Sequence, residues 1–197
     1  MFKRYLFLLL SMAVMTVYGQ SAKSVLDAAS KQLTSGGTYA NFTVIADGSK
    51  LWGNIAIKGD MFKITSADAI TWYDGKTQWT YMTGTDEVNI SNPTKEQQQM
   101  INPYHFISLY KNGYSSKLSK KGSNNVVTLK SSSAKNEISD AVIEIDSKTG
   151  YPSYIKVKAD GKWTEFKITG AKKVNYYKSH FRFPEKKYKD AEIIDLR

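Results

Sequence analysis

The chain has no cysteine among its 197 residues and only four prolines. Without cysteine, no disulfide can hold the fold, and no thiol can take up the acyl anchor of a lipoprotein. A hydrophobic core must therefore stabilise the protein by itself, and the chain is long enough to build one.

Histidine is scarce too, since only His105 and His180 occur in the chain. Neither has a second histidine or a cysteine at the spacing of metal ligands, and the chain has no Gly-x-Ser-x-Gly motif and no glycine-rich phosphate loop. Paired carboxylates such as Asp86-Glu87 lie near turns, where solvation explains them. The sequence therefore predicts a protein that is not an enzyme and that needs no cofactor or metal.

Arginine is nearly absent after residue 19, where only Arg182 and Arg197 remain, although the formal net charge is +10. Removal of Lys3 and Arg4 with the first 19 residues, which hold no acidic residue, leaves +8. Phosphate and base recognition favour clustered arginine, so we expect no nucleic-acid partner. The lysines are spread as on a solvated outer face, and they would also favour approach to an anionic membrane surface.

A long apolar run occurs only at the start, where Lys3 and Arg4 precede the apolar residues 5–17. The run is short for a membrane span, and this order is typical of a secretory signal peptide, with cleavage expected near Gly19 and Gln20. An uncleaved N-terminal anchor is the alternative. We therefore expect residues 1–19 to be a signal peptide and residues 20–197 to form one soluble domain, exported across the inner membrane.

The first element after the leader is predicted to be an amphipathic helix that packs on a sheet. Ser24 is the expected N-cap, and Gly36-Gly37 follows the last turn. The apolar residues that recur at helical spacing are Val25, Leu26, Ala29 and Leu33.

From residue 38 onward, apolar and polar residues alternate with period two, which predicts an antiparallel sheet with one dry face and one wet face. Asp74-Gly75 between two alternating runs is the strongest hairpin signal, and Asp160-Gly161 repeats it. Trp72 precedes the first turn while Trp79 and Tyr81 follow it, so these three side chains can share one sheet face. Short last strands are expected at 174–177 and 191–196.

Two short helices are predicted between residues 93 and 113, where the strand pattern stops. The first begins at Thr94, with Gln97 three residues on, and the second opens at Pro103. We expect both to cover the concave side of the sheet as a lid. The apolar lid residues are Met100, Ile101, Phe106, Ile107 and Leu109.

An apolar interior between sheet and lid is the predicted binding site. The residues assigned to it are Ile55, Ile57, Phe62, Trp72, Trp79, Tyr81, Ile155, Phe166 and Ile168. Alternation does not tell which face of each strand is concave, and a closed core would use the same residues.

A series of short motifs, in this order and spacing, resembles a known family. The motifs are Gly53-x-Ile55-x-Ile57-Lys58, Met61-Phe62, Trp72-Tyr73-Asp74-Gly75-Lys76-Thr77-x-Trp79-x-Tyr81, Asn102-Pro103, Ile143-x-Ile145, Asp160-Gly161, Phe181-x-Phe183-Pro184 and Ile193-Ile194-Asp195. Together they look like the periplasmic outer-membrane lipoprotein carriers of the LolA type, over nearly the whole chain after the leader.

The resemblance implies a mainly β fold with some α: an incomplete antiparallel β-barrel of about ten or eleven strands, with a helical lid over a hydrophobic cavity. It implies a soluble, monomeric chaperone of the periplasm that shuttles acylated lipoproteins to the outer membrane. Its implied partners are an inner-membrane lipoprotein-releasing transporter and an outer-membrane acceptor. Because each exposed methylene costs about 0.8 kcal/mol, acyl chains need such a cover in water.

One position departs from the family pattern. Gram-negative carriers have Arg-Pro just before the Met61-Phe62 position, and this chain has Gly59-Asp60 there, with Lys58 the nearest base. The family's arginine contributes to lid closure, so that role is not carried over.

Two other functions fit the same sequence. A carrier of fatty acids or sterols would share all the physics and differ only in its cargo. A β-rich structural module of the cell surface would instead place its aromatic residues in a closed core, without an accessible cavity.

Overall fold

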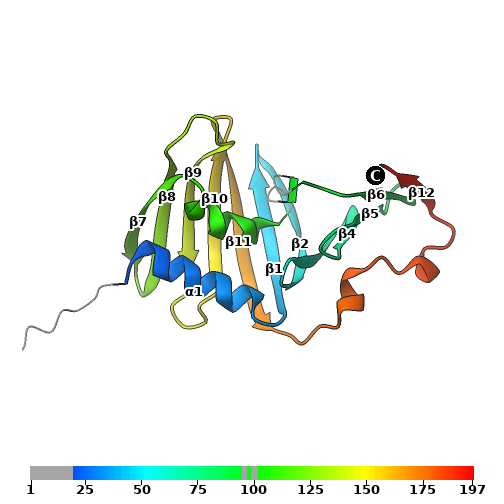
Figure 1. Ribbon diagram of the computed structural model, residues 1–197, viewed down its shortest axis with the longest axis horizontal. Helices are drawn as coiled ribbons and strands as arrows, with labels where there is room; N and C mark the ends of the chain where they lie inside the picture. The colour runs from blue at the N-terminus through cyan, green and yellow to red at the C-terminus, as the bar shows by residue number, and fades with distance from the viewer. Residues whose placement is uncertain (1–19, 95–96, 99–101) are drawn as a thin grey trace, which may run out of the picture.

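One twelve-stranded sheet dominates the computed structural model, which describes residues 20–94, 97–98 and 102–197 (Figure 1). The strand order across the sheet is β12-β6-β5-β4-β3-β2-β1-β11-β10-β9-β8-β7. Neighbouring strands pair antiparallel except β12, which runs parallel to β6. β7 and β12 are the two outermost strands, so the sheet is open, as in an incomplete barrel. The mainly β, unclosed fold is confirmed, with twelve strands where ten or eleven were expected.

Tight turns connect most strands. The strand bounds are β1 Thr38–Ala46, β2 Ser49–Lys58, β3 Met61–Ser66, β4 Ala69–Tyr73, β5 Gln78–Met82, β6 Glu87–Ser91, β7 Tyr114–Lys121, β8 Asn124–Ser131, β9 Ile138–Ile145, β10 Pro152–Ala159, β11 Lys162–Lys173 and β12 Glu192–Asp195. In the β10–β11 turn, Asp160 and Gly161 have φ of 49° and 77°. Positive φ at both central residues matches the twist of a hairpin, which is why Asp-Gly predicted this turn.

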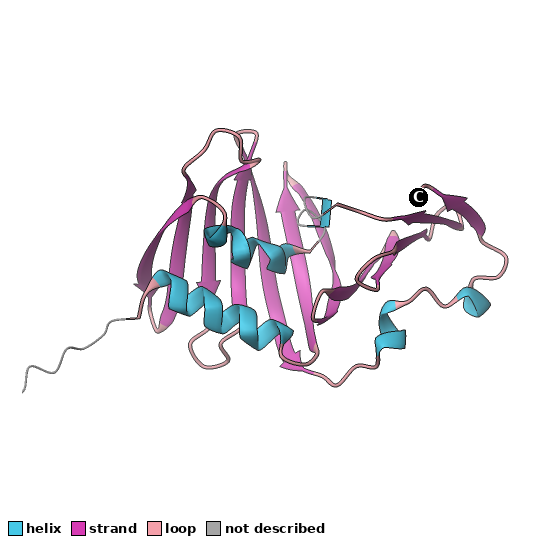
Figure 2. Cartoon of the chain, in the orientation of Figure 1, coloured by secondary structure: helices cyan, strands magenta, loops and turns pink. Residues whose placement is uncertain are grey.

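The single long helix, α1 (Ala22–Thr34), crosses one face of the sheet (Figure 2). Its N-cap is Ser21, whose Oγ accepts a hydrogen bond from the Ser24 amide at 3.0 Å, while the Ser24 Oγ accepts one from the Ser21 amide at 3.0 Å. The predicted N-cap, Ser24, is therefore wrong by one turn, because this serine closes a capping box from inside the helix. The predicted apolar stripe is buried: Val25, Leu26, Ala29 and Leu33.

The described residues also form 3-10 helices: η1 (Pro103–Lys111), η2 (Lys178–Phe181) and η3 (Glu185–Lys187). η1 is the second predicted lid helix, and the Asn102 side chain caps it by accepting from the Tyr104 amide at 3.0 Å. The first predicted lid helix falls largely outside the described residues. The strand expected at 174–177 is absent, since β11 ends at Lys173 and an irregular segment follows.

The main core lies between α1, η1 and one face of the sheet, which we call the inner face; the opposite face is the outer face. Strand register fixes its composition: Val44 of β1 is opposite Leu51 of β2 and Phe166 of β11. Two residues along, Phe42 is opposite Gly53 and Ile168. Because side chains alternate along each strand, these rows form one continuous apolar surface.

Gly53 of β2 permits a close approach within this surface. A Cβ at this position would lie 2.3 Å from the carbonyl oxygen of Thr65 and 2.8 Å from the ring of Phe42. Because the Thr65 backbone is held by β2–β3 pairing, we expect Gly53→Ala to lower the free energy of unfolding by about 1–3 kcal/mol, measured by urea unfolding. Gly84→Ala is the matched control, since nothing lies within 4 Å of its Cβ. Equal losses in the two variants would contradict this explanation.

Candidate functional site

Most of the residues predicted to line the cavity lie together on the inner face. They are buried in one hydrophobic cluster, to which β2, β3, β10 and β11 contribute. The members of the prediction found there are Ile55, Ile57, Phe62, Ile155, Phe166 and Ile168. Pairing of β1 with β11 brings these residues from the two halves of the chain into one surface.

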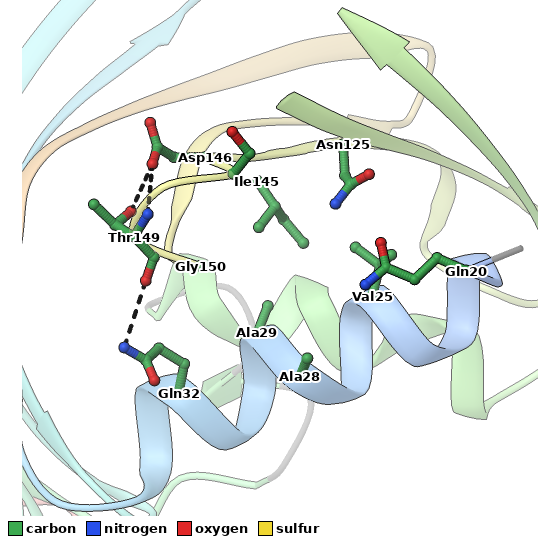
Figure 3. Close-up of a pocket in the computed structure, with 11 residues that line it drawn as sticks. Gln20, Val25, Ala28, Ala29, Gln32, Asn125, Ile145, Asp146, Thr149 and Gly150 are labelled. Carbon is green, nitrogen blue, oxygen red and sulfur yellow. Dashed lines mark hydrogen bonds between the residues drawn. The ribbon is translucent and has the colours of Figure 1, made fainter. Parts of the chain in front are cut away.

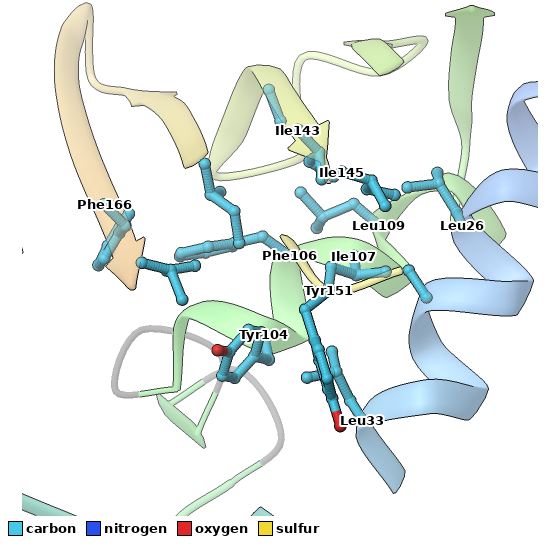
Figure 4. Packing of buried hydrophobic residues seen from close by; sticks show 14 of the residues in the cluster. Leu26, Leu33, Tyr104, Phe106, Ile107, Leu109, Ile143, Ile145, Tyr151 and Phe166 are labelled. Atoms are coloured by element: carbon cyan, nitrogen blue, oxygen red, sulfur yellow. The ribbon is translucent and has the colours of Figure 1, made fainter. Parts of the chain in front are cut away.

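η1 covers this surface together with α1, as Figure 4 shows. Phe106, Ile107 and Leu109 of η1 are buried in the same cluster, and the ring centroids of Phe106 and Phe166 are 5.5 Å apart. The described part of the predicted lid thus packs on the sheet. The other predicted lid residues, Met100 and Ile101, lie outside the described residues.

An apolar cavity of about 310 Å³ remains between η1 and the sheet. Its walls come from β1, β2, β3, β9, β10, β11 and η1: Phe42, Val44, Leu51, Ile64, Phe106, Ile138, Val157, Ala159, Thr164 and Phe166. One end is closed by Phe106, which is buried, and Leu51 at the other end is 41% exposed. The cavity therefore opens toward the β1–β2 and β10–β11 turns, and we call that end its mouth.

Several cavity residues were not singled out from the sequence, notably Phe42, Val44 and Leu51. The alternation of β1 and β2 contained the signal, since each of them lies on the same side of its strand as Ile55. The missing information was the pairing of β1 with β11, which places Val44 beside Phe166.

The assignment of Trp72, Trp79 and Tyr81 to this interior needs correction. They do share a sheet face, because Trp72 is opposite Trp79, but it is the outer face. The reason is register: Phe62 on the inner face is opposite Tyr73, which leaves the adjacent Trp72 pointing the other way.

The C-terminal segment covers these outer-face aromatic residues in a second hydrophobic cluster. Trp72 packs edge-on against Phe183, with ring centroids 5.5 Å apart, and against Tyr188 at 5.7 Å. Tyr81 lies 4.4 Å from Tyr188, centroid to centroid. The motif that most clearly marks the hairpin therefore anchors the chain's end and does not line the cavity.

A second hollow, of about 260 Å³, separates α1 from the β9–β10 turn (Figure 3). Its walls are mostly polar or small, and Gln32 reaches across to donate a hydrogen bond to the Thr149 carbonyl oxygen at 3.5 Å. Asp146 is committed to its own turn, where it accepts from the Thr149 amide at 2.8 Å. This hollow has the character of a solvated seam and contrasts with the apolar cavity.

Comparison with known proteins shows what this arrangement belongs to. The family model of the outer membrane lipoprotein carrier protein LolA matches residues 12–162. The chain belongs to this family. Comparison with curated proteins finds no match.

Solved structures share the fold of this LolA-family chain. An uncharacterised conserved protein from Thermus thermophilus is 16% identical, with a TM-score of 0.61 over 89% of this chain and 99% of the other. A LolA superfamily protein from Nitrosomonas europaea is 9% identical, with a TM-score of 0.46 over 84% and 99%. A putative outer membrane lipoprotein-sorting protein domain from Vibrio parahaemolyticus is 12% identical, with a TM-score of 0.44 over 86% and 100%. In the described part of the chain, every helix is too short or too polar to cross a membrane.

The position that departs from the LolA family pattern is the β2–β3 turn, Gly59-Asp60. Lys58 just before it donates a hydrogen bond to the Tyr176 carbonyl oxygen, which joins the end of β2 to the segment after β11. η1 has another polar contact, in which the Tyr110 hydroxyl donates to the Asp27 carboxylate of α1. Lys58 therefore braces the C-terminal segment, and apolar packing together with the Tyr110–Asp27 bond holds η1.

Burial shifts the titration of polar groups under η1. The pKa of Tyr104 is raised by burial and then by Tyr151, and the pKa of Tyr110 is raised to about 12 by burial and then by Asp27. The hydroxyl oxygens of Tyr104 and Tyr151 are buried and have no hydrogen-bond partner among the described residues. An apolar ligand with a polar head could satisfy such hydroxyls if η1 moved.

His105 of η1 makes the cover pH-dependent. Burial lowers the pKa of His105 below its usual value of 6.5, with Asp60 partly opposing the shift. The folded state therefore favours the neutral ring, so stability is full above pH 6.5 and falls as the pH drops through the lowered pKa. We expect His105→Gln to reduce the loss of stability between about pH 7 and pH 5, measured from urea midpoints.

His180 supplies the comparison, because burial and then Lys63 lower its pKa as well. His180→Gln should remove a separate part of the same pH dependence, and the double variant should remove both. If His105→Gln leaves the pH profile of the midpoint unchanged, the titration of His105 does not act on the cover.

Proposed function

We propose that this protein is a periplasmic carrier that binds the acyl chains of lipoproteins in the cavity under η1 and shuttles them to the outer membrane. The carrying observation is the apolar cavity itself, opened to solvent at Leu51 in a protein of the LolA family. Nine of its ten lining residues are apolar, with Thr164 the exception. Such a lining can cover methylene groups worth about 0.8 kcal/mol each in water.

The size of the cavity supports a cover that moves. At about 310 Å³ it is close to the lower end of the roughly 300–1,000 Å³ range of small-ligand pockets. Several acyl chains need more room, and the sheet is rigid because each inner strand pairs on both sides. η1 is the element whose displacement would join the cavity to the rest of the inner face.

η1 is suited to this movement. It is a 3-10 helix, which has poorer hydrogen-bond geometry than an α-helix. Its hold on the sheet comes from a few buried side chains, chiefly Phe106, Ile107 and Leu109, at roughly 1.5–3 kcal/mol each. Acyl chains that replace these contacts would return much of that free energy, so loading and opening can be coupled.

The remaining parts of the proposal concern the route of the carrier. We propose that residues 1–19 are a signal peptide, that residues 20–197 form a single soluble domain, and that the protein acts without a catalytic step. Its partners would be acylated lipoproteins, an inner-membrane releasing transporter and an outer-membrane acceptor. An N-terminus at or near Gln20 in protein isolated from cells, determined by mass spectrometry, would support this route; retention of residues 1–19 would contradict it.

The cavity volume also favours a second candidate, a carrier of a single-chain ligand such as a fatty acid. About 310 Å³ suits one slender apolar molecule without displacement of η1. Solvent extraction of the purified protein and mass spectrometry of bound lipids distinguish the two, because one yields a free acid and the other an acylated peptide.

Filling the cavity should weaken binding. Val44 lines the cavity, and its neighbour Thr43 lies on the outer face of the same strand. We expect Val44→Phe to reduce the affinity for a hydrophobic fluorescent probe, and for a triacylated lipopeptide that displaces it, by about tenfold or more, or about 1.4 kcal/mol. Thr43→Phe is the matched control and should bind as the parent protein does. Equal binding by both variants would place the ligand elsewhere.

Restraining η1 should block loading. Ser108 of η1 and Asp60 of the β2–β3 turn line the same small hollow of about 170 Å³. Because the chain has no cysteine of its own, Ser108→Cys/Asp60→Cys can be bridged by a reducible bifunctional thiol reagent. We expect the bridged protein to keep its fold and to lose uptake of lipopeptide until it is reduced.

The single variants treated with the same reagent are the controls, and both should load normally. If the bridged protein accepts lipopeptide as fast as the reduced protein, η1 is not a gate and cargo enters through the mouth alone.

A further inference from the structure

Two of the four tryptophans of the chain are on its surface. Trp52 is 64% exposed and Trp163 is 37% exposed, whereas Trp72 is 2% exposed. Exposure of such large apolar side chains on a soluble domain marks a surface that contacts a partner.

Strand register places both exposed tryptophans on the outer face, at the end of the sheet that carries the cavity mouth. Thr43 of β1 is opposite Trp52, and two residues further on, Ile45 is opposite Lys50 on one side and Glu165 on the other. Trp163 lies two residues before Glu165 on β11. Trp52, Ile45 and Trp163 therefore form a diagonal across three adjacent strands.

The cavity mouth adjoins this diagonal. Leu51 lies between Lys50 and Trp52 in β2, and alternation turns its side chain to the inner face, where it lines the cavity. The mouth thus has an apolar lip, Leu51, with a tryptophan next to it in the chain. We call Lys50, Leu51, Trp52, Lys158 and Trp163 the tryptophan rim.

The charge around the rim is positive. On the strands and turns of β1, β2, β10 and β11 beyond Thr43, five lysines face three carboxylates, an excess of two positive charges: Lys50, Lys156, Lys158, Lys162 and Lys167 against Asp47, Asp160 and Glu165. On the adjoining strands, Asp140 opposite Lys158 is offset by Lys130 on its other side.

Some of these lysines have partners, and others are open to an external anion. Lys162 pairs with Asp47 at 2.8 Å and Lys156 with Glu165 at 2.9 Å. Within the described residues, Lys50, Lys158 and Lys167 form no ion pair. Lys158 and Lys156 lie 5.8 and 4.9 Å from the Trp163 ring centroid, so cations surround an exposed indole.

We propose that the tryptophan rim docks on an anionic phospholipid surface and sets the cavity mouth against the bilayer. Indole rings favour the membrane–water interface, and each lysine near an anionic surface adds attraction. A protein partner would also use tryptophan, but excess lysine is depleted at protein interfaces and favours lipid. The inference rests on the proposed function in one respect: docking would let an acyl chain pass between bilayer and cavity without crossing water.

Vesicle flotation tests the docking surface, with protein expressed from the full chain and its N-terminus determined by mass spectrometry. We expect binding to phosphatidylcholine vesicles that contain about one third phosphatidylglycerol, weaker binding to pure phosphatidylcholine, and release at about 0.5 M salt. Trp52→Ser/Trp163→Ser should weaken binding to the anionic vesicles about tenfold or more. Tyr177→Ser, at an aromatic residue that is 83% exposed outside the rim, is the matched control and should bind normally.

The charge is tested separately. Lys50→Gln/Lys158→Gln should reduce binding to anionic vesicles and leave binding to neutral vesicles unchanged. Lys148→Gln/Lys178→Gln, which removes as many lysines outside the rim, should have a smaller effect. Circular dichroism and the thermal midpoint of each variant show whether it is folded.

Brominated lipids give a second readout that needs no loss of binding. In a Trp163→Phe variant, the fluorescence of exposed Trp52 should be quenched by brominated anionic vesicles, whereas Trp52→Phe/Trp163→Phe, which keeps buried Trp72 and packed Trp79, should show little quenching. Binding that is indifferent to the rim variants, quenching that persists in the double variant, or concentration-dependent dimers that the tryptophan changes dissolve would each overturn the proposal.

The two proposals fail separately. The rim variants should bind the fluorescent probe in lipid-free solution as the parent protein does. If the parent protein binds vesicles but takes up neither probe nor lipopeptide, the carrier function fails and the docking surface stands. If it takes up lipopeptide but never floats with anionic vesicles, the reverse holds.

Discussion

The pairing of β1 with β11 is the interaction on which the rest of the structure depends. It joins the N-terminal meander, β1 to β6, to the C-terminal meander, β7 to β11, and it sets Val44 beside Phe166 and Phe42 beside Ile168. Without it, each half would be a sheet with too little apolar area on one face to pack alone. With it, the inner faces of both halves become one surface that α1 and η1 can cover.

This single surface has a consequence for function. The sheet is open, so its inner face is closed by helices rather than by further strands, and helices can leave without breaking the ladder. α1 is capped at Ser21 and buries a full apolar stripe, while η1 is a short 3-10 helix with a few buried side chains. The cover therefore has a firm part and a weak part, and the cavity lies under the weak one.

Much of this fold could be predicted from the sequence, because Asp-Gly turns and period-two alternation are local signals. Asp160-Gly161 predicted its hairpin, and Val25 and Leu26 predicted the buried stripe of α1. The faces of β4 and β5 could not be assigned in this way. Whether Trp72 points inward depends on its register with β3, where Phe62 is opposite Tyr73, and on a C-terminal segment more than a hundred residues away that brings Phe183 to cover it.

The same limit applies to the cavity. Ile55, Phe166 and the residues of η1 were assigned from apolar alternation, and the mouth at Leu51 emerges only when β1 and β11 are paired. The departure at Gly59-Asp60 also has its explanation in long-range contact, since Lys58 bonds to Tyr176 and not to η1. Sequence patterns give the faces of single strands, and the fold decides which faces meet.

Site-specific photocrosslinking in living cells would test directly whether the cavity carries acylated cargo. A benzophenone amino acid would replace Phe166, which lines the cavity, or its neighbour Lys167, which points to the outer face. A carrier of lipoproteins should give adducts at position 166 that contain acylated lipoproteins and should give few at position 167. Adducts of equal yield at the two positions, or none with an acylated protein at position 166, would contradict a lipoprotein-binding cavity.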